Sequence, residues 1–453
     1  MPNIQKVKPR TLSGFMELPP EKQIVFDLMT SRVRESFESF GFAPLDTPVI
    51  ESAEVLLAKA GGETEKQIYR LTKGERDLAL RFDLTVPLAK YAAANYGSLA
   101  FPFRRYQIGK VYRGERSQRG RYRELYQADI DVVGDGALGL FSDAEIPAVI
   151  YRTFRALGLG GFAIRISNRK ILTGFFETLG LTERSGDIMR AVDKLDKIGA
   201  GKLRELLLSE LSLPAPDAEA VLSLALASGE GDALDALESR AGRSETFDRG
   251  LRELREVTRL MEELGVPKTH YKVDPAVARG LDYYTGTVYE TILTEHPDVG
   301  SVCSGGRYDD LAGHYTDKKL PGVGMSIGLT RLFFILDDTG LFDPRLMTAP
   351  CDAIIIPMTG DLSHAARLAS SMRAAGLRVS VYSEDKKPGQ KLAYADKLGV
   401  PFAVFLGEDE IKSGRITVKN MDTGEQTTAS PGMLTEGIKE KTAERKRLAP
   451  VGG

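Results

Sequence analysis

The chain has 453 residues, of which 42% are hydrophobic and 27% charged, a balance typical of a globular protein with two or three domains. Its formal net charge is −2, so a nucleic-acid partner would be held by local basic patches rather than by the field of the whole chain. No apolar run approaches the roughly 20 residues that span a bilayer, and the N-terminus lacks the apolar segment of a secretory signal. We therefore expect a cytoplasmic protein with no membrane partner.

Cysteine and histidine are scarce. The two cysteines, Cys303 and Cys351, form no C-x-x-C pair, and the four histidines show no metal-binding or triad spacing. The sequence therefore predicts no disulfide framework and no zinc site, and it assigns no residue to a metal. An enzyme of this composition would depend on arginines, carboxylates and bound phosphates.

The first predicted element is a helix over residues 21–41, which Gly41 ends. Apolar residues recur within it at helical spacing, namely Val25, Phe26, Met29, Val33 and Phe37. Residues 101–133 then alternate aromatic and β-branched residues with charges around glycine-containing turns. This pattern predicts an antiparallel hairpin with a polar face.

Residues 183–265 are rich in leucine, alanine and charged residues and nearly free of aromatics, which predicts an inserted helical module. Strand character returns at "HYKVDP" and continues through "GVGMSIGLTRLFFIL", which leads into a helix. Beyond the predicted linker at 340–350, short β-runs alternate with helical stretches. That order predicts a small, partly parallel sheet with helices packed on it.

A basic cluster lies within the predicted hairpin. The 20 residues from Arg104 to Arg123 contain eight lysines or arginines and one acid. The cluster can be a solvated sheet edge. Alternatively, because seven of the eight are arginines interleaved with tyrosines, it can bind phosphate and stack on bases.

Asp83 and Thr85 form a second candidate site in "RFDLTVPLAKY". On a strand, residues two apart face the same way and could receive an ammonium group. The same residues also suit the start of a helix, with Pro87 in its first turn. The two interpretations are compatible, because a helix cap on a cleft wall can expose one carboxylate oxygen.

Two glycine-rich segments, "SVCSGGRYDDL" and "GVGMSIGLTRLFF", permit close backbone approach. Their glycine spacing matches neither a dinucleotide fingerprint nor a P-loop, so neither builds a nucleotide site of those kinds. Cys303 is expected to be a small buried hydrophobe rather than a nucleophile, because no histidine is placed to activate it.

The segment "ARGLDYYTGTVYE" places an arginine, Arg279, before two adjacent tyrosines. On a strand, Tyr283 and Tyr284 would point to opposite faces. We therefore expect one of them to read a ligand and the other to pack against the pocket wall.

In this order the segments resemble the motifs of class II aminoacyl-tRNA synthetases. "RGLDYYTGTVYE" and "GGRYDDL" resemble two peptides peculiar to the histidyl-tRNA synthetase family, residues 103–134 resemble the second class motif, and "GVGMSIGLTRL" the third. Residues 41–48 resemble the first motif, which builds the dimer interface in this class. The C-terminal region is similar to the family's α/β anticodon-binding domain.

The resemblance implies an α+β fold, with a class II antiparallel sheet flanked by helices, a helical insertion and a C-terminal α/β anticodon-binding domain. The expected boundaries are 1–182 for the first part of the catalytic domain, 183–265 for the insertion, 266–342 for the second part and 350–453 for the anticodon-binding domain.

The resemblance also implies an activity. Histidine would react with ATP to give histidyl-adenylate and pyrophosphate, and would then pass to the 3′ end of histidine tRNA. The implied partners are L-histidine, ATP with Mg²⁺, histidine tRNA and a second copy of the chain. No zinc and no organic prosthetic group is expected.

Residue roles carry over by motif. Arg113 and Arg279 would be catalytic, holding the α-phosphate and the histidine carboxylate, and Gln118 would contact the tRNA acceptor end. ATP would be bound by Arg113, Glu115 and Arg331. Histidine would be bound by Asp83, Leu84, Thr85, Arg113, Gln127, Asp131, Arg279, Tyr283 and Tyr284, with Asp131 and Tyr284 on the imidazole nitrogens.

Two other functions remain open from the sequence. A synthetase-like regulatory paralogue of histidine biosynthesis would share the catalytic fold but usually lacks the anticodon domain and has eroded motifs. A tRNA-sensing module would bind uncharged tRNA without activating an amino acid and would tolerate the loss of Arg279 or Asp131. This chain retains both residues.

Overall fold

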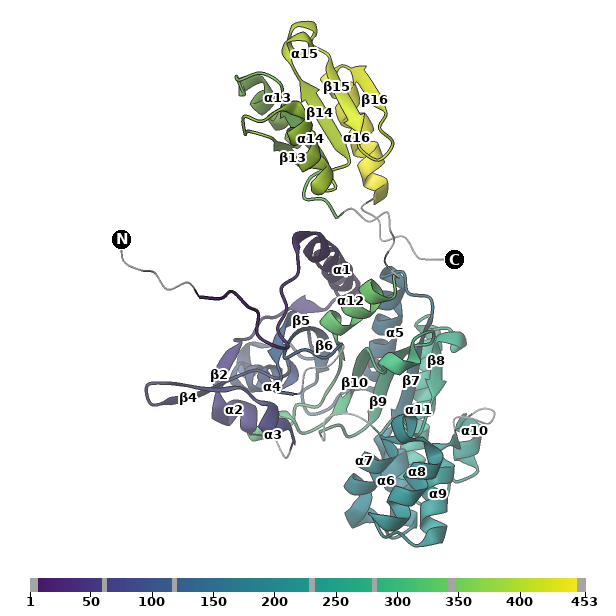
Figure 1. Cartoon of the computed structure of the whole chain (residues 1–453). Coiled ribbons are helices and arrows are strands. Elements are labelled where there is room, and N and C mark those ends of the chain that lie inside the picture. The colour runs from purple at the N-terminus through teal and green to yellow at the C-terminus, as the bar shows by residue number, and fades with distance from the viewer. Residues whose placement is uncertain are drawn as a thin grey trace. The chain divides into compact units, whose positions relative to one another are not determined.

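The computed structural model describes residues 7–58, 63–115, 120–227, 233–278, 283–340, 342 and 348–445. The chain divides into two compact units (Figure 1). The larger comprises Met1–Met16 and Arg32–Thr339 with the last two residues, and the smaller comprises Glu17–Ser31 and Gly340–Val451.

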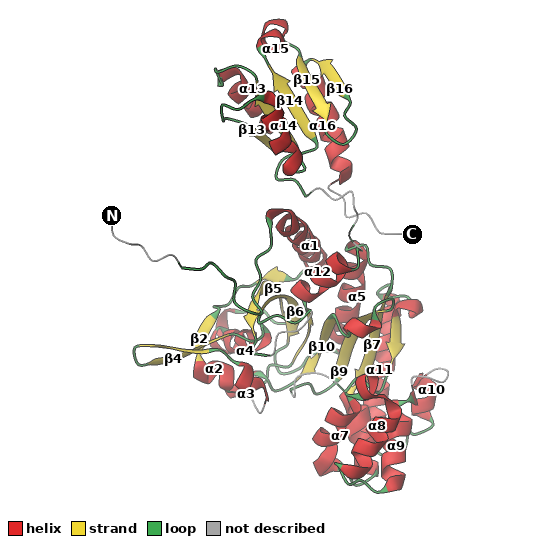
Figure 2. Ribbon diagram, in the orientation of Figure 1, coloured by secondary structure: helices red, strands yellow, loops and turns green. Residues whose placement is uncertain are grey.

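An eight-stranded sheet forms the centre of the larger unit (Figure 2). In spatial order its strands are β1 (Ala43–Pro44), β5 (Phe103–Tyr112), β6 (Glu124–Val133), β11 (Gly322–Ile327), β10 (Cys303–Tyr308), β9 (Thr287–Leu293), β7 (Phe162–Asn168) and β8 (Tyr271–Val273). Only the outermost pairs, β1 with β5 and β7 with β8, are parallel. The predicted hairpin over 101–133 is confirmed as β5 and β6, whose register pairs Arg105 with Asp131.

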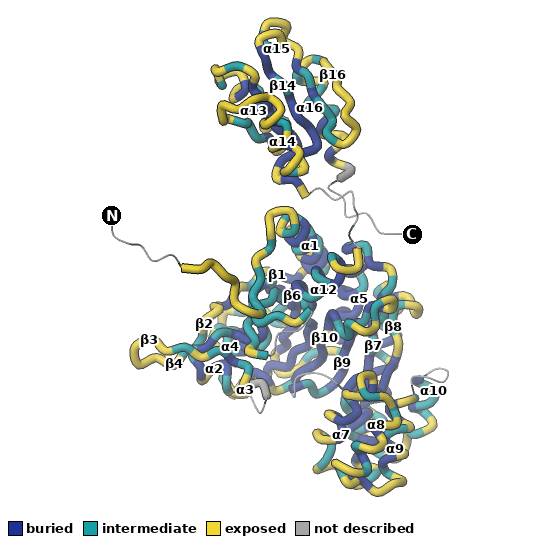
Figure 3. The backbone as a smooth tube through the Cα atoms, viewed as in Figure 1, coloured by how far each residue is buried: buried dark blue, intermediate teal, exposed yellow. Residues whose placement is uncertain are grey.

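The first part of the chain also forms a second, antiparallel sheet of three strands. It contains β2 (Ile50–Ser52), β4 (Arg76–Leu80) and β3 (Arg70–Lys73) in that order. Three helices accompany it, namely α2 (Ala53–Leu57), α3 (Glu63–Gln67) and α4 (Thr85–Ala94). Figure 3 shows β3 and the tip of β4 as exposed, whereas the central strands of the large sheet are buried.

The long helices agree with the apolar periodicity of the sequence. The helix predicted over 21–41 is α1 (Pro20–Ser39), and its five apolar positions are all buried. Helix α5 (Leu140–Ala156) packs on β11, and α12 (Leu329–Asp338) packs on β6. The strand-to-helix transition predicted in "GVGMSIGLTRLFFIL" is therefore confirmed as β11 followed by α12.

The leucine- and alanine-rich part of the chain is helical. Its helices are α7 (Ser185–Val192), α8 (Leu195–Ser209), α9 (Ala215–Ala225), α10 (Ala233–Glu238) and α11 (Glu245–Glu263), and α6 (Arg169–Thr178) directly precedes it. Helix α11 returns to pack on α6, α5 and β7, whereas α7 to α10 lie to one side of the sheet (Figure 1).

Helices α6 and α11 approach closely because each carries a glycine that faces the backbone of the other. A Cβ on Gly174 would lie 2.7 Å from the Phe247 Cα, and one on Gly250 would lie 2.9 Å from the Ile171 nitrogen. At the same end of the pair, Glu177 accepts hydrogen bonds from the hydroxyls of Ser244 (2.7 Å) and Thr246 (3.0 Å).

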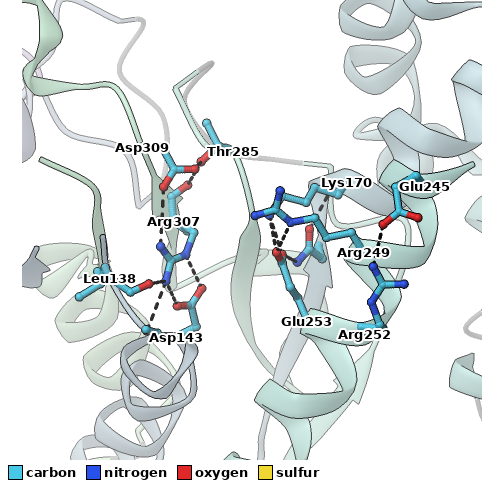
Figure 4. Close-up of polar contacts among 12 residues, drawn as sticks. Leu138, Asp143, Lys170, Glu245, Arg249, Arg252, Glu253, Thr285, Arg307 and Asp309 are labelled. Carbon is cyan, nitrogen blue, oxygen red and sulfur yellow. Dashed lines mark hydrogen bonds and ion pairs between the residues drawn. The ribbon is translucent and has the colours of Figure 1, made fainter. Parts of the chain in front are cut away.

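Farther along the crossing, Glu253 of α11 is a shared acceptor (Figure 4). It receives hydrogen bonds from Lys170 Nζ (2.6 Å), Asn168 Nδ2 (2.9 Å) and Arg249 Nε (3.0 Å). Lys170 and Asn168 fix α11 to the junction of β7 and α6, whereas Arg249 lies on α11 itself.

The smaller unit contains a five-stranded sheet in the order β13 (Val379–Val381), β12 (Ala353–Pro357), β14 (Phe402–Leu406), β15 (Ile416–Asn420) and β16 (Gln426–Ala429). Strands β13, β12 and β14 are parallel, and the others pair antiparallel. The partly parallel sheet is thus confirmed. Its helices are α13 (Ser363–Ala374), α14 (Pro388–Lys397), α15 (Glu408–Ser413) and α16 (Pro431–Arg445).

The predicted α+β class is confirmed: a large, mainly antiparallel sheet flanked by helices accompanies a separate sheet-and-helix unit. None of the helices in the described part of the chain is long and apolar enough to cross a membrane.

Candidate active site

A cavity of about 260 Å³ opens on the large sheet. Seven of the predicted site residues line it: Asp83, Thr85, Arg113, Gln127, Asp131, Tyr283 and Tyr284. They come from the start of α4, the end of β5, strand β6 and the segment before β9. The fold therefore brings together residues that are up to two hundred positions apart in the sequence.

Strand β6 supplies one wall because its side chains alternate between two faces. Gln127, Asp129 and Asp131 line the cavity, whereas the intervening Ala128 and Ile130 are fully buried apolar residues. Asp129 was not among the predicted site residues. The period-two pattern of "QADID" is the signal that could have identified it.

Asp83 lies just before α4 rather than on a strand, so the strand interpretation of Asp83 and Thr85 is wrong. Asp83 Oδ1 accepts a hydrogen bond from the Val86 backbone N–H (3.0 Å), as expected at a helix start. Asp83 Oδ2 is buried and has no hydrogen-bond partner among the described residues. One carboxylate oxygen therefore holds the helix while the other remains available to a ligand.

Arg113 projects from the end of β5 toward Gln127. Its Nε donates to the Phe82 carbonyl (3.1 Å), and its Nη2 lies 3.5 Å from Gln127 Oε1. Gln127 in turn donates through Nε2 to Ser326 Oγ (2.5 Å). The guanidinium is thus oriented by a carbonyl and an amide, and no carboxylate of the described residues forms an ion pair with it.

The two tyrosines lie in irregular backbone before β9, not on a strand. Both side chains line the cavity, with ring centroids 4.9 Å apart in an edge-to-face arrangement. The expectation that Tyr283 and Tyr284 point to opposite faces is therefore wrong, because the two-residue alternation of a strand does not apply to a turn.

Asp131 is the centre of a buried polar network. Arg105, which is fully buried, donates from Nη2 to Asp131 Oδ2 (2.7 Å) and to the Leu84 carbonyl (3.1 Å). The Tyr308 hydroxyl donates to Asp131 Oδ1 (2.9 Å). Neither Arg105 nor Tyr308 was among the predicted site residues.

The three cavity carboxyl groups are all hard to ionise, because burial removes the solvation that favours their charged forms. Burial raises the pKa of Asp129 to about 7 and that of Asp131 to about 6. The pKa of Asp83 is raised for the same reason, although hydrogen bonds from the start of α4 and the charge of Arg113 oppose the shift. Burial also raises the pKa of Tyr284 strongly, so its hydroxyl remains a donor at neutral pH.

A second buried arginine fixes the segment that follows the tyrosines (Figure 4). Arg307 Nε donates to Asp143 Oδ1 (3.0 Å), and its Nη2 donates to the Leu138 carbonyl (3.0 Å). The Arg307 carbonyl accepts from the Thr285 backbone N–H (2.8 Å), and the Thr285 hydroxyl donates to Asp309 (2.6 Å). Strand β10 thereby connects α5 to the backbone that carries Tyr284.

Several predicted residues lie elsewhere. The Leu84 side chain is buried and does not line the cavity. Glu115 lies 3.6 Å from Arg121, and Arg331 donates to the Val299 carbonyl; neither lines the cavity. Arg279 and Gln118 lie outside the described residues.

Cys303 behaves as expected. It is buried, its Sγ lies 3.6 Å from the sulfur of Met325, and burial raises the pKa of its thiol. Within the described ranges, no group of three or more histidine, cysteine or acidic side chains could hold a metal ion.

Comparison with known proteins assigns this arrangement to a family. The histidyl-tRNA synthetase model matches residues 14–332, and the anticodon binding domain model matches residues 352–441. The chain belongs to the histidyl-tRNA synthetase family. The resemblance inferred from the motifs is therefore confirmed.

Relatives within the histidyl-tRNA synthetase family match nearly the full length. The chain is 49% identical over 434 residues to the histidine–tRNA ligase of Clostridium tetani, covering 96% of this chain and 98% of that protein. It is 46% identical over 467 residues to the histidine–tRNA ligase of Stenotrophomonas maltophilia, covering 97% and 99%.

Solved structures agree. The histidyl-tRNA synthetase of Nostoc sp. PCC 7120 has a TM-score of 0.87 at 38% identity, covering 96% of this chain and 100% of that one. An ATP phosphoribosyltransferase regulatory subunit/histidyl-tRNA synthetase from Bacillus halodurans C has a TM-score of 0.72 at 21% identity, covering 89% and 99%. At that identity the second likeness shows the fold alone.

Proposed function

We propose that the chain is a histidine–tRNA ligase that first activates histidine with ATP and then transfers it to the 3′ end of histidine tRNA. Family membership supports the reaction class. The cavity supports histidine as the substrate. In it, a guanidinium, two tyrosines and a carboxylate oxygen that has no partner in the described part of the chain surround a space for a small ligand.

In the first step, a carboxylate oxygen of histidine attacks the α-phosphorus of ATP. A bond forms between them, and the bond from that phosphorus to the bridging oxygen breaks, releasing pyrophosphate. The protein assists mainly by alignment and by neutralising developing charge. Arg113 and Arg279 bridge the carboxylate and the α-phosphate, because a guanidinium stays protonated and can bind both.

In the second step, a terminal ribose hydroxyl of the tRNA attacks the carbonyl carbon of the adenylate, and AMP leaves with the electron pair of the broken bond. Glu115 and Arg331 position ATP, which enters with Mg²⁺ on its phosphates. Gln118 contacts the tRNA acceptor end.

The ammonium group of histidine binds at Asp83, Thr85 and Gln127. Asp83 Oδ2 lies in the cavity, buried and without a hydrogen-bond partner among the described residues, so an incoming cation supplies what it lacks. Leu84 contributes through its backbone, since its carbonyl holds Arg105 next to Asp131.

The imidazole ring binds between Asp131 and Tyr284, with Tyr283 shaping the pocket. A site that satisfies ring nitrogens discriminates strongly against apolar analogues, because its own buried polar groups would be left without partners. Such discrimination can reach roughly 10⁴–10⁵ without editing.

The remaining assignments follow from the same family. Residues 1–182 and 266–342 form the catalytic domain, residues 183–265 the helical insertion, and residues 350–453 the anticodon-binding domain. The chain acts as a homodimer in the cytoplasm, with histidine tRNA as its macromolecular substrate.

The decisive experiment is pyrophosphate exchange into ATP with each of the twenty amino acids. We expect exchange with histidine alone. Arg113→Gln should reduce exchange by orders of magnitude, whereas Arg204→Gln, in an exposed pair with Glu219, should not change it. Absence of exchange with every amino acid, on folded protein, would favour the regulatory paralogue or the tRNA-sensing module instead.

A further inference from the structure

Asp129 has no assigned role, yet it is one of the most deeply placed groups in the cavity. Its residue is 2% exposed, and its Oδ1 atom has no hydrogen-bond partner among the described residues. Ser326 lies directly opposite Asp129 on β11, and its hydroxyl group opposes the rise in the pKa of the Asp129 carboxyl group. Because Ser326 accepts from Gln127, its own hydroxyl hydrogen can point toward Asp129. Asp129 Oδ1 is thus left for a ligand.

Among the described residues, the charges that line the cavity do not balance without a ligand. Its described lining carries three carboxyl groups, from Asp83, Asp129 and Asp131, and one guanidinium, from Arg113. Arg105 lies behind the lining and is paired with Asp131. If Asp83 binds the substrate ammonium, Asp129 is the remaining carboxyl group, and it forms an ion pair with neither Arg113 nor Arg105.

The proposed contacts of the imidazole ring do not involve Asp129, although it lies beside them. Tyr284 as a donor and Asp131 as an acceptor suit a neutral imidazole, which has one nitrogen of each kind. Asp129 lies on the same face of β6 as Asp131, two residues away, and Asp129 and Tyr284 interact electrostatically. A ring that carries a proton on both nitrogens would donate to Asp131 and to Asp129, and would no longer accept from Tyr284.

We propose that Asp129 is a specificity-determining residue that receives the substrate imidazole and shares one proton with it, so that histidine binds with one proton distributed over this ring–carboxyl pair. The inference rests on the proposed function and adds to it the protonation state in which the substrate is recognised. When neither group carries the proton beforehand, it is taken from solvent. When both carry one, a proton is released to solvent.

The groups around Asp129 that carry or can carry charge come from each neighbouring element. They are Arg81 and Arg105 on the β5 side, Asp131 on β6, Asp83 before α4, Tyr284 before β9, and Cys303 on β10. An arginine guanidinium stays charged at neutral pH, and Tyr284 and Cys303 remain neutral because burial raises their pKa. Asp131 is paired with Arg105, and Asp83 holds the start of α4 and faces the substrate ammonium. Asp129 and the substrate ring are left as the pair that exchanges a proton near pH 7.

The first test is the pH dependence of kcat/KM for histidine in pyrophosphate exchange. With a pKa of about 7 for Asp129 and about 6.5 for a free imidazole, the one-proton state falls about tenfold between pH 7 and pH 8.5. Asp129→Asn cannot hold the proton, so its kcat/KM should stay nearly constant over that range. Asp135→Asn, at an exposed acid that accepts from Tyr96 (2.8 Å), is the matched control and should follow the parent.

The second test counts protons directly. Calorimetric titration of histidine at pH 8, in buffers of different ionisation enthalpy, should give an uptake of about 0.9 proton for the parent. The Asp129→Asn variant should give an uptake near zero. 2-Fluorohistidine, whose ring is far less basic, should bind the parent much more weakly than histidine and should bind the variant with a smaller difference.

The outcomes separate the two proposals. If the parent shows histidine-dependent exchange but Asp129→Asn keeps the same pH profile and proton uptake, the inference is wrong and the proposed function stands. If the parent shows no exchange at all, the proposed function fails, and proton uptake on histidine binding still decides whether Asp129 receives the ring. Altered stability with an unchanged profile would make Asp129 structural only.

Discussion

The buried pair between Arg105 and Asp131 allows a quantitative test of what holds the site together. The two side chains are 0% and 4% exposed, and Arg105 Nη2 lies 2.7 Å from Asp131 Oδ2. Asp131→Ala would leave the guanidinium with the Leu84 carbonyl, since its Nε and Nη1 already lack partners among the described residues. A buried charge that loses its partner is strongly destabilising.

The size of the effect follows from this geometry. Removing one partner of a buried pair costs about 3–5 kcal/mol. Asp129 also interacts with Arg105 and can ionise more fully when Asp131 is absent, which offsets part of the loss. We therefore expect about 3 kcal/mol, which for a unit of this size is a fall of about 4 °C in its unfolding midpoint.

Scanning calorimetry can follow the transition of the larger unit. The double variant Arg105→Met with Asp131→Leu should be much closer to the parent than Asp131→Ala, because apolar residues can replace both members of a buried pair at little cost. Glu219→Ala, which breaks the exposed pair with Arg204, should change stability by less than about 1 kcal/mol. The reasoning would be refuted if Asp131→Ala were as stable as the parent. It would also be refuted if the double variant lost as much free energy of unfolding as Arg105→Met and Asp131→Leu lose together.

Three further predictions concern the same cavity. Gly324→Ala would place a Cβ 2.5 Å from Asp131 Cγ, so it should raise KM for histidine and lower the free energy of unfolding by about 1–3 kcal/mol. The control Gly201→Ala, in open space on a helix, should leave KM unchanged and keep or slightly increase stability. Equal effects of the two substitutions would contradict the packing argument. Asp83→Asn should raise KM for histidine about 10–100-fold with KM for ATP unchanged, because an amide cannot balance an ammonium; a similar rise for ATP would remove Asp83 from the ammonium site. The pKa of Asp129 is raised from 3.8 in the unfolded chain to about 7, so the folded protein binds the proton more tightly and loses stability as pH rises from about 4 to 7. Urea unfolding should therefore find Asp129→Asn more stable than the parent at pH 8, by roughly 1–3 kcal/mol, and no such gain at pH 4; a gain independent of pH would show that ionisation is not the cause.

The sequence predicted those parts of the fold that depend on local pattern. Helix α1 was predicted from apolar residues at helical spacing, and the β5–β6 hairpin from alternation around glycines. The motifs also identified seven of the residues that line the cavity, because each motif is short and continuous.

The rest depends on contacts between distant segments. Arg105, Asp131 and Tyr308 meet because four neighbouring strands, β5, β6, β11 and β10, pair in one register, and no local pattern states that register. Tyr283 and Tyr284 share a cavity because their segment is a turn, which the apparent β-character of "DYYTGTVYE" concealed. Asp129 was visible in the alternation of "QADID", but its importance comes from burial and from the charges around it.

The close crossing of α6 and α11 has a consequence for how this chain can vary. Glu177, near the end of α6, holds Ser244 and Thr246 at the start of α11, so the chain leaves α6 and returns to it at nearly one point. The residues between α6 and α11 form an insertion whose two ends lie close together. The entropic cost of closing such a loop changes only slowly with its length. A short linker could therefore replace the insertion while α11 stays packed on α6. Substitutions within the insertion would not be limited by the packing of the large sheet. The crossing of α6 and α11 is therefore a site at which one inserted module can be replaced by another, in evolution or by design.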